Sequence, residues 1–251
     1  MRAEPSYDRV WEEFGALDEV SPAAQHRRRL IVELVRDHAR EAQRVLDAGC
    51  GPGALLRVLR RALPDAQLWG VDGSDTALSR ARVACRRARL SKFDLATAEH
   101  AAPNASFDLV ICSEVLEHLT DDVAALRRLR ELVAPNGRLI VTVPGDQPTT
   151  FDHAIGHVRH YSLVSLRDTL QAADFRVERL FAWGFPFHST YRALVRQASR
   201  RALAGSDDHA AMRSPQPAFA FGYRLLAAPL SALYFMNSSA LGPQLFAVAR
   251  Q

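Results

Sequence analysis

The stretch from Val45 to Gly53, VLDAGCGPG, decides the fold of this chain. A short apolar strand leads to Asp47, three glycines follow within five positions, and an apolar helical period starts near Ala54. Because glycine has no Cβ, the backbone of such a turn can adopt positive φ and approach a ligand closely. The order strand, glycine turn, helix therefore predicts a βα unit that binds a ligand at the turn.

A second acid strengthens this prediction. Asp72 ends the next expected strand, and Gly73 and Ser74 follow it directly. A carboxylate at that position can accept hydrogen bonds from both hydroxyls of a ribose. The glycine turn and this acid together indicate a nucleoside-containing cofactor, and they disfavour a tight turn without a ligand.

The apolar pattern then alternates between the periods of strands and helices. We expect strands at 44–48, 67–72, 92–98, 107–112 and 138–143, with helices at 54–63, 75–89 and 121–133 between them. Such alternation predicts parallel strands joined by helical crossovers. A long loop should follow Pro144, Ser162 should cap a helix over 162–173, and strands should follow at 175–181 and 244–250. We divide the chain into a helical lead-in (1–43), a cofactor-binding core (44–183), an apolar helical insertion (184–243) and a last core strand (244–251).

Composition narrows the partners and the compartment. The chain has 251 residues, a net charge of +4 and a pI near 9.3, but its arginines and its single lysine are interleaved with 28 acids. A nucleic-acid partner is therefore not expected. Three cysteines without paired spacing, no apolar signal segment and no apolar run long enough to span a membrane favour a reducing, cytoplasmic location.

These motifs resemble those of class I S-adenosylmethionine-dependent methyltransferases, specifically the bacterial small-molecule group. The GxGxG spacing differs from the GxGxxG of dehydrogenases, and the stretches 69–74, 106–118 and 138–144 are similar to the family's second, fourth and fifth strands. The resemblance covers about residues 40–182 and the final strand. It implies a Rossmann-like fold: a seven-stranded, mostly parallel sheet with an antiparallel last strand, extended here by a helical N-terminal lead-in and a helical insertion before that strand.

The resemblance also implies where S-adenosylmethionine is held. Asp47, Gly49, Cys50 and Gly51 would line its methionine end, Asp72, Gly73 and Ser74 its ribose, and the backbone at Cys112 and Ser113 its amino group or sulfonium. For the adenine, Asp94, Ala98 and Glu99 compete. Counting back from Phe107 favours Ala98 and Glu99.

The segment FDHAIGHVRHYS, residues 151–162, follows the fifth strand and should hang over the edge of the sheet where substrates bind. His157 or His160 is the candidate general base, since a histidine suits proton removal near neutral pH. Loop-structuring hydrogen bonds are the alternative. His118 has either a structural or an acid-base role. Arg159 would anchor an anionic group or hold the loop, and Tyr7, His153 and Tyr161 complete the expected substrate contacts.

We expect no metal, although His153, His157 and His160 have spacings that would bring imidazoles together on a helix. Gly156 and the missing apolar period make that helix doubtful. The insertion at 184–243 would act as a lid, a dimer face, an added core layer or a weak membrane contact.

The expected activity is methylation of a small-molecule acceptor, at a hydroxyl oxygen of a natural-product or sugar-bearing compound. The alternatives are transfer to nitrogen or carbon, a lipid-linked glycan methyltransferase at a membrane, and a protein that binds the cofactor without methylating. Cys112-Ser-Glu-Val stands where a Pro-Pro-Tyr type signature would follow the fourth strand, which disfavours methylation of adenine or glutamine.

Overall fold

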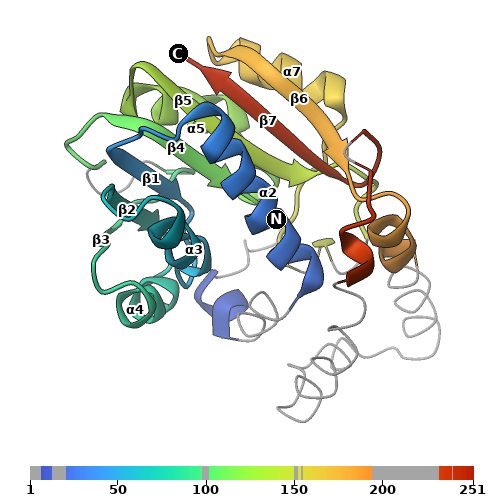
Figure 1. Ribbon diagram of the computed structural model, residues 1–251, viewed down its shortest axis with the longest axis horizontal. Helices are drawn as coiled ribbons and strands as arrows, with labels where there is room; N and C mark the ends of the chain where they lie inside the picture. The colour runs from blue at the N-terminus through green and yellow to red at the C-terminus, as the bar shows by residue number, and fades with distance from the viewer. Residues whose placement is uncertain are drawn as a thin grey trace.

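A single mixed sheet forms the centre of the molecule (Figure 1). The computed structural model describes residues 7–12, 21–97, 102–149, 152–153, 155–193, 232–238 and 240–251. The strands are β1 (Arg44–Ala48), β2 (Gln67–Asp72), β3 (Arg89–Lys92), β4 (Phe107–Ser113), β5 (Val133–Pro144), β6 (Arg176–Trp183) and β7 (Gln244–Arg250), in the sheet order β3-β2-β1-β4-β5-β7-β6. The first five are parallel, and β7 runs antiparallel between β5 and β6. The predicted Rossmann-like, seven-stranded sheet is confirmed.

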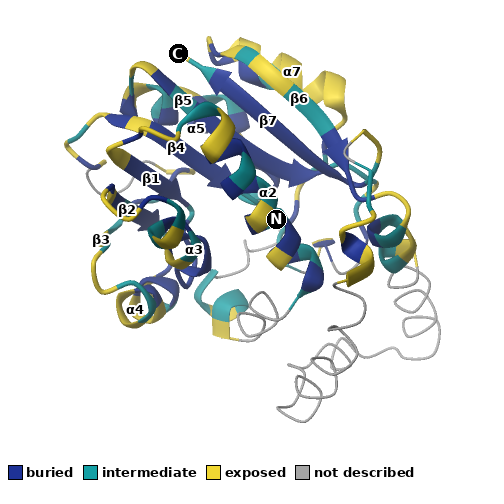
Figure 2. Cartoon of the chain, in the orientation of Figure 1, coloured by how far each residue is buried: buried dark blue, intermediate teal, exposed yellow. Residues whose placement is uncertain are grey.

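Helices cover both faces of this sheet. On one face lie α2 (Pro22–His38), α3 (Ala54–Ala62) and α4 (Asp75–Ala84), and on the other lie the 3₁₀ turn η1 (Leu116–His118), α5 (Asp122–Leu132) and α7 (Leu163–Ala172). Neighbouring strand residues alternate between the layers, so Val45 packs with α2 and α3 while Leu46 packs with α5. Most residues of the central strands are consequently buried, whereas α7 exposes its outer side (Figure 2).

Polar caps fix where the helices begin. Ser21 accepts a hydrogen bond from the Ala24 amide, and Pro22 occupies the first position of α2, where no amide donor is needed. The Ser74 hydroxyl accepts from the Ala77 amide at the start of α4. The predicted cap at Ser162 is confirmed, because Ser162 and Ser165 form a reciprocal capping box at the start of α7.

The strand order reverses direction at β1. The chain moves outward from β1 through β2 to β3, and then returns to place β4 on the other side of β1. In parallel sheets of this type ligands bind at the carboxyl ends of the strands next to such a switch point. The loops after β1, β2, β4 and β5 therefore surround one location.

Three elements have an end that lies more than two residues from the sequence prediction. The third strand is Arg89–Lys92 and not 92–98, α4 ends at Ala84, before residue 89, and β5 starts at Val133, before residue 138. Strand β3 lies at the sheet edge and none of its residues is fully buried, so it lacks the apolar signature of a central strand. The apolar pattern that led to the prediction of a strand over 92–98 comes from Phe93 and Leu95. Both follow β3 and pack in the core.

The segment before the last strand is only partly described. Residues 187–193 and 232–234 are helical, and an isolated bridge joins Phe185 to Ser238. Most of the predicted insertion, residues 194–231, lies outside the described residues. Among the residues that the structure describes, no helix is both long and apolar enough to cross a membrane.

Candidate cofactor and acceptor site

The turn after β1 has the backbone that its glycines predict. Gly49, Gly51 and Gly53 all have positive φ, at 78°, 51° and 83°. A Cβ on Gly49 would lie 2.3 Å from the Val115 side chain, and one on Gly51 would lie 2.7 Å from the Trp11 ring. The turn therefore tolerates no side chain at these positions.

The end of β2 holds this turn in place. The amides of Gly49 and Cys50 donate to the carbonyl of Val71 at 2.8 and 2.9 Å. The Asp72 carboxylate accepts from the Gly51 amide at 2.8 Å and from the Ser74 amide at 2.9 Å. Burial raises the pKa of Asp72, and these two backbone hydrogen bonds oppose that rise. Asp72 and Gly73 also line the large cavity described below, while the Ser74 hydroxyl is engaged at the start of α4.

Asp47 presents an unsatisfied carboxylate at the same place. Its side chain is 2% exposed, and its Oδ2 has no hydrogen-bond partner among the described residues. Burial, together with the charge of Asp72, raises the pKa of Asp47 to about 8. A buried polar atom without a partner is costly, so this oxygen is a site for a donor supplied by a ligand.

The corrected end of β3 changes the candidate for the adenine contact. Phe93, Asp94 and Leu95 line the cavity directly after β3. The preference for Ala98 and Glu99 came from counting back from Phe107, and both residues lie outside the described part of the chain. Of the three candidates for the adenine contact, Asp94 is the one that the structure describes, and it borders the cavity.

At the end of β4 the chain makes a strained turn. Glu114 has φ of 56°, which is unusual for a residue with a side chain. Its carboxylate accepts from the Thr142 hydroxyl at 3.0 Å and from the Gln244 amide group at 2.8 Å, and it pairs with Arg27 at 3.3 Å. Three distant segments thus hold this residue in its strained conformation.

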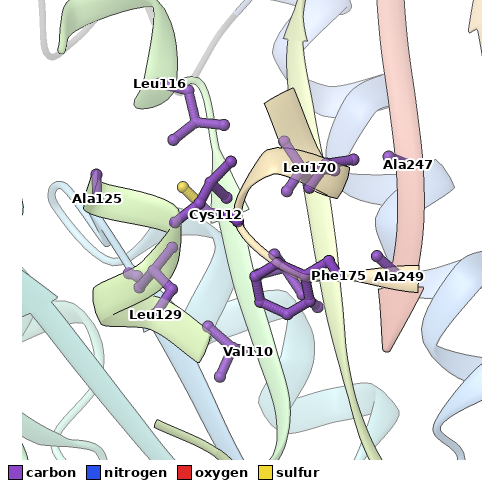
Figure 3. Close-up of a cluster of buried hydrophobic side chains, with 14 of the residues drawn as sticks. Val110, Cys112, Leu116, Ala125, Leu129, Leu170, Phe175, Ala247 and Ala249 are labelled. Carbon is purple, nitrogen blue, oxygen red and sulfur yellow. The ribbon is translucent and has the colours of Figure 1, made fainter. Parts of the chain in front are cut away.

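The two residues predicted before Glu114 have different surroundings. Ser113 lines the cavity, and its hydroxyl bonds that of Thr142 at 2.8 Å. The side chain of Cys112 packs in the core among Leu116, Ala125 and Leu129, as Figure 3 shows. Burial raises the pKa of its thiol, so Cys112 behaves as a small apolar residue and only its backbone is available for the predicted contact.

We call residues 145–162, between β5 and α7, the histidine loop. In this loop the imidazoles of His157 and His160 form a hydrogen bond whose direction can be assigned. His160 Nδ1 lies 2.6 Å from the carbonyl oxygen of Asp146, which can only accept, so this nitrogen carries a proton. His160 Nε2 lies 2.9 Å from His157 Nδ1. With both rings neutral, His157 donates to His160 and keeps the lone pair on its own Nε2. Burial, together with the charge of His118, lowers the pKa of His157 to about 3.

His157 meets two unsatisfied side chains from η1. The rings of His118 and His157 are 4.6 Å apart at 86°. Among the described residues, His118 Nδ1 and both carboxylate oxygens of Glu117 are buried without hydrogen-bond partners. Burial lowers the pKa of His118 and, with the neighbouring Glu114, raises that of Glu117. We call Glu117, His118 and His157 the acceptor corner, since all three line the cavity.

Other predicted residues of the loop have partners within the protein. The Tyr161 hydroxyl donates to Asp122 at 2.7 Å, and Arg159 pairs with the same carboxylate at 2.7 Å. His153 is exposed, and its Nδ1 bonds the carbonyl of His157 at 3.1 Å. His160 is bonded through both ring nitrogens. None of these four side chains borders the cavity. The hydrogen bonds of His153, Arg159, His160 and Tyr161 instead hold the loop around His157 in shape.

The cavity encloses about 600 Å³ and extends from the glycine turn to the acceptor corner. Tyr7, as predicted for a substrate contact, lies on its wall. Sequence reasoning did not single out several other lining residues: Trp11, Arg27, Glu114, Glu117, Tyr191, Arg192 and Gln244. The spacing Glu-x-x-Glu-His at 114–118 was a usable signal for the two glutamates. No spacing rule connects Trp11 or Arg192 to the glycine turn.

Two groups of donor atoms are compact enough to share one small ligand. Among the described residues, the acceptor corner is one such group, and Asp152, His157 and His160 form the other, each with its donor atoms within 4.8 Å of one another. His153, which the spacing had suggested as a partner of His157 and His160, belongs to neither. The expectation of no metal is therefore tested by experiment below.

The cavity at the switch point, the glycine turn and the acid after β2 define a Rossmann-like protein that binds a nucleoside cofactor. Comparison with known proteins gives the particular family. The model of the methyltransferase domain family matches residues 23–180. A ubiquinone biosynthesis O-methyltransferase of Stutzerimonas stutzeri is 31% identical over 183 residues, which cover 70% of this chain and 75% of the relative. Alignments with two further ubiquinone biosynthesis O-methyltransferases, the first relatives found, span only 38% and 39% of their length.

Solved structures agree on the fold. The [4+2]-cyclase SpnF is 20% identical with a TM-score of 0.62, and the match covers 99% of this chain and 97% of SpnF. Magnesium protoporphyrin IX methyltransferase from Synechocystis, solved with bound S-adenosylhomocysteine, is 24% identical with a TM-score of 0.53, covering 69% of this chain and 86% of that one. This chain belongs to the class I S-adenosylmethionine-dependent methyltransferases, and S-adenosylmethionine is its cofactor.

The residues present fit this cofactor. The glycine turn leaves room where a Cβ would intrude, and Asp47 offers an unsatisfied oxygen to a cationic donor. Asp72 borders the cavity as an acceptor for hydroxyl groups. When bound, S-adenosylmethionine supplies an electrophilic methyl group.

We predict that Asp47→Asn stabilises the cofactor-free protein increasingly as pH rises. The folded chain holds the Asp47 proton up to about pH 8, whereas the unfolded chain releases it near its ordinary pKa. Wild type therefore loses stability between these values, by up to about 1.4 kcal/mol per pH unit, and asparagine does not titrate. Urea unfolding at pH 5 and pH 8 measures the difference. Asp65→Asn, on an exposed turn, is the control, and a pH-independent effect of Asp47→Asn would contradict the prediction.

Tyr161→Phe should lower the free energy of unfolding by about 2 kcal/mol, because it removes a buried hydrogen bond to a carboxylate. The KM for the acceptor should not change, since Tyr161 does not border the cavity. Denaturant titration and steady-state kinetics measure the two quantities. A raised KM with unaltered stability would instead restore the original prediction that Tyr161 contacts the substrate.

Proposed function

We propose that this protein transfers the methyl group of S-adenosylmethionine to a hydroxyl oxygen of a small molecule. The observation that carries the proposal is the acceptor corner, where a neutral imidazole and a buried carboxyl group without a hydrogen-bond partner among the described residues line the same cavity as the glycine turn. The cavity volume of about 600 Å³ suits a cofactor together with a compact acceptor. The similarity to a ubiquinone biosynthesis O-methyltransferase supports an oxygen acceptor.

His157 is our proposed proton acceptor. Its Nδ1 is committed to His160, so its Nε2 is the nitrogen that can take a proton from the acceptor hydroxyl. Burial keeps the pKa of His157 low, so the ring is neutral and its Nε2 lone pair is free before the reaction; binding the proton then requires the negative charge beside the ring. As the proton arrives, the ionised carboxylate of Asp152, whose donor atoms lie within 4.8 Å of those of His157 and His160, stabilises the positive charge that forms on the ring.

The remaining residues orient the acceptor and exclude water. Glu117 is placed to receive a hydrogen bond from the acceptor, which would satisfy one of its unpartnered oxygens. Trp11 of the stretch 7–12 lies against the glycine turn, and Tyr191 and Arg192 also border the cavity. The contact of Tyr191 and Arg192 with the cavity supports a role of the insertion as a lid, while its Tyr234 packs in the core.

We expect His157→Gln to reduce kcat at least about a hundredfold, because the reaction loses its proton acceptor. The Kd for S-adenosylmethionine should stay within about threefold of wild type, since Asp47 and Asp72 are untouched. Formation of S-adenosylhomocysteine with a panel of hydroxylated acceptors measures kcat, and calorimetry measures the Kd. His38→Gln, at the far end of α2, is the control. An equal loss of affinity and turnover would make His157 part of the cofactor site.

The same assay separates the alternatives. Fragmentation of the product identifies methylation on oxygen, nitrogen or carbon. Cofactor binding without S-adenosylhomocysteine formation across the panel would favour a protein that does not methylate.

Prior dialysis against a chelator should leave turnover unchanged. If turnover is lost after dialysis and returns when a divalent cation is added, the acceptor corner is a metal site and His157 is one of its ligands.

A further inference from the structure

Arg192 joins the described part of the insertion to the histidine loop. Its guanidinium donates to Asp146 at 2.7 and 3.1 Å and to Asp152 at 3.1 and 3.3 Å. Arg192 lies in the helical stretch 187–193, thirty residues beyond Ser162 at the end of the loop. Four donor contacts to two carboxylates use the planar fork of an arginine in a way that a lysine cannot reproduce.

Both aspartates contact the histidine pair directly. The carbonyl of Asp146 accepts from His160 Nδ1, and the carbonyl of Asp152 accepts from the His157 amide at 2.9 Å. The Asp152 carboxylate accepts from the Thr149 amide at 2.6 Å and lies 4.0 Å from His160 Nε2. The positions of His157 and His160 consequently depend on where these two aspartates are held.

Both carboxylates are ionised. Burial acts to raise the pKa of Asp146, but hydrogen bonds from His160 and Arg192 outweigh it and hold the value at about 2. Arg192 and the Thr149 backbone likewise overcome the effect of burial and lower the pKa of Asp152. A partly buried pair of negative charges needs a positive partner, and Arg192 occupies that place.

We propose that Arg192 is a positioning residue for the proposed methyl transfer: by holding Asp146 and Asp152 together, it keeps His160 bonded to His157 and leaves the lone pair of His157 on Nε2. The expected fall in kcat rests on the proposed function, whereas the effect of Arg192 on the His157 tautomer does not. Without the guanidinium, the Asp152 carboxylate becomes the stronger acceptor beside the rings, so an imidazole N–H turns toward it and the bond between the two histidines is lost.

Arg192 also connects residues 187–193, a described part of the proposed lid, to His157, the proposed base. Arg192 and its neighbour Tyr191 border the cavity, while the aspartates that Arg192 holds support the residue that takes the proton. Docking of residues 187–193 on the histidine loop therefore completes the enclosure and orients the base in one step.

The test uses the full chain, saturated with S-adenosylhomocysteine for spectroscopy and with S-adenosylmethionine for kinetics. In Arg192→Leu we expect kcat to fall at least about tenfold, while the Kd for S-adenosylmethionine changes less than about threefold. Nitrogen-15 spectra of histidine-labelled protein should show His157 protonated on Nδ1 in wild type and a redistributed tautomer in the variant. Arg192→Lys should recover part of both. Thr190→Ala, exposed on the same helical stretch, should match wild type.

Folded Arg192→Leu with wild-type kcat and wild-type His157 signals overturns the proposal. If Arg192→Leu does not fold, Arg192→Lys decides, because it keeps the charge but loses the fork, and unchanged kcat and signals then overturn it. The spectra distinguish this failure from failure of the proposed function. If no acceptor yields S-adenosylhomocysteine, the His157 signals still show whether Arg192 sets the tautomer.

Discussion

The bond from the Gly51 amide to the Asp72 carboxylate is the constraint on which the cofactor half of the molecule depends. It joins the glycine turn after β1 to the end of β2, and the same carboxylate accepts from Ser74 at the start of α4. Ser74 in turn bonds Asp8, which brings the N-terminal residues over the turn. The buried Asp72 carboxylate thus fixes the glycine turn and the start of α4 and, through Ser74, the N-terminal residues that lie over the turn.

The site has unsatisfied polar groups where a ligand can use them. Asp47 contributes one orphaned oxygen next to the glycines, and Glu117, which also lines the cavity, contributes two. Proteins seldom bury such atoms, because each costs free energy in the absence of a partner. Their concentration in one cavity means that the protein gives up stability for binding, as ligand-binding sites commonly do.

Local patterns predicted the part of the structure that local interactions determine. The strand, turn and helix around Gly49 have the expected conformation because the positive φ angles require glycine, and Ser162 caps α7 as its position implied. The third strand was misplaced, since an edge strand need not be apolar while Phe93, just beyond it, is buried. Arg192 and Gln244 could not be foreseen, because each reaches the site from a segment far along the chain and only the folded sheet brings them there.

Strand β7 has an unusual consequence for the order in which the protein forms. The last strand in the sequence is an interior strand of the sheet, and β6, which precedes it, has no other strand to pair with (Figure 1). During synthesis on the ribosome, β6 must wait as an unpaired edge until residues 244–250 emerge. Gln244 then brings its side chain to Glu114, 130 residues earlier in the chain. The nascent chain therefore cannot bring Gln244 to Glu114, or give β6 its partner strand, before residues 244–250 have left the ribosome.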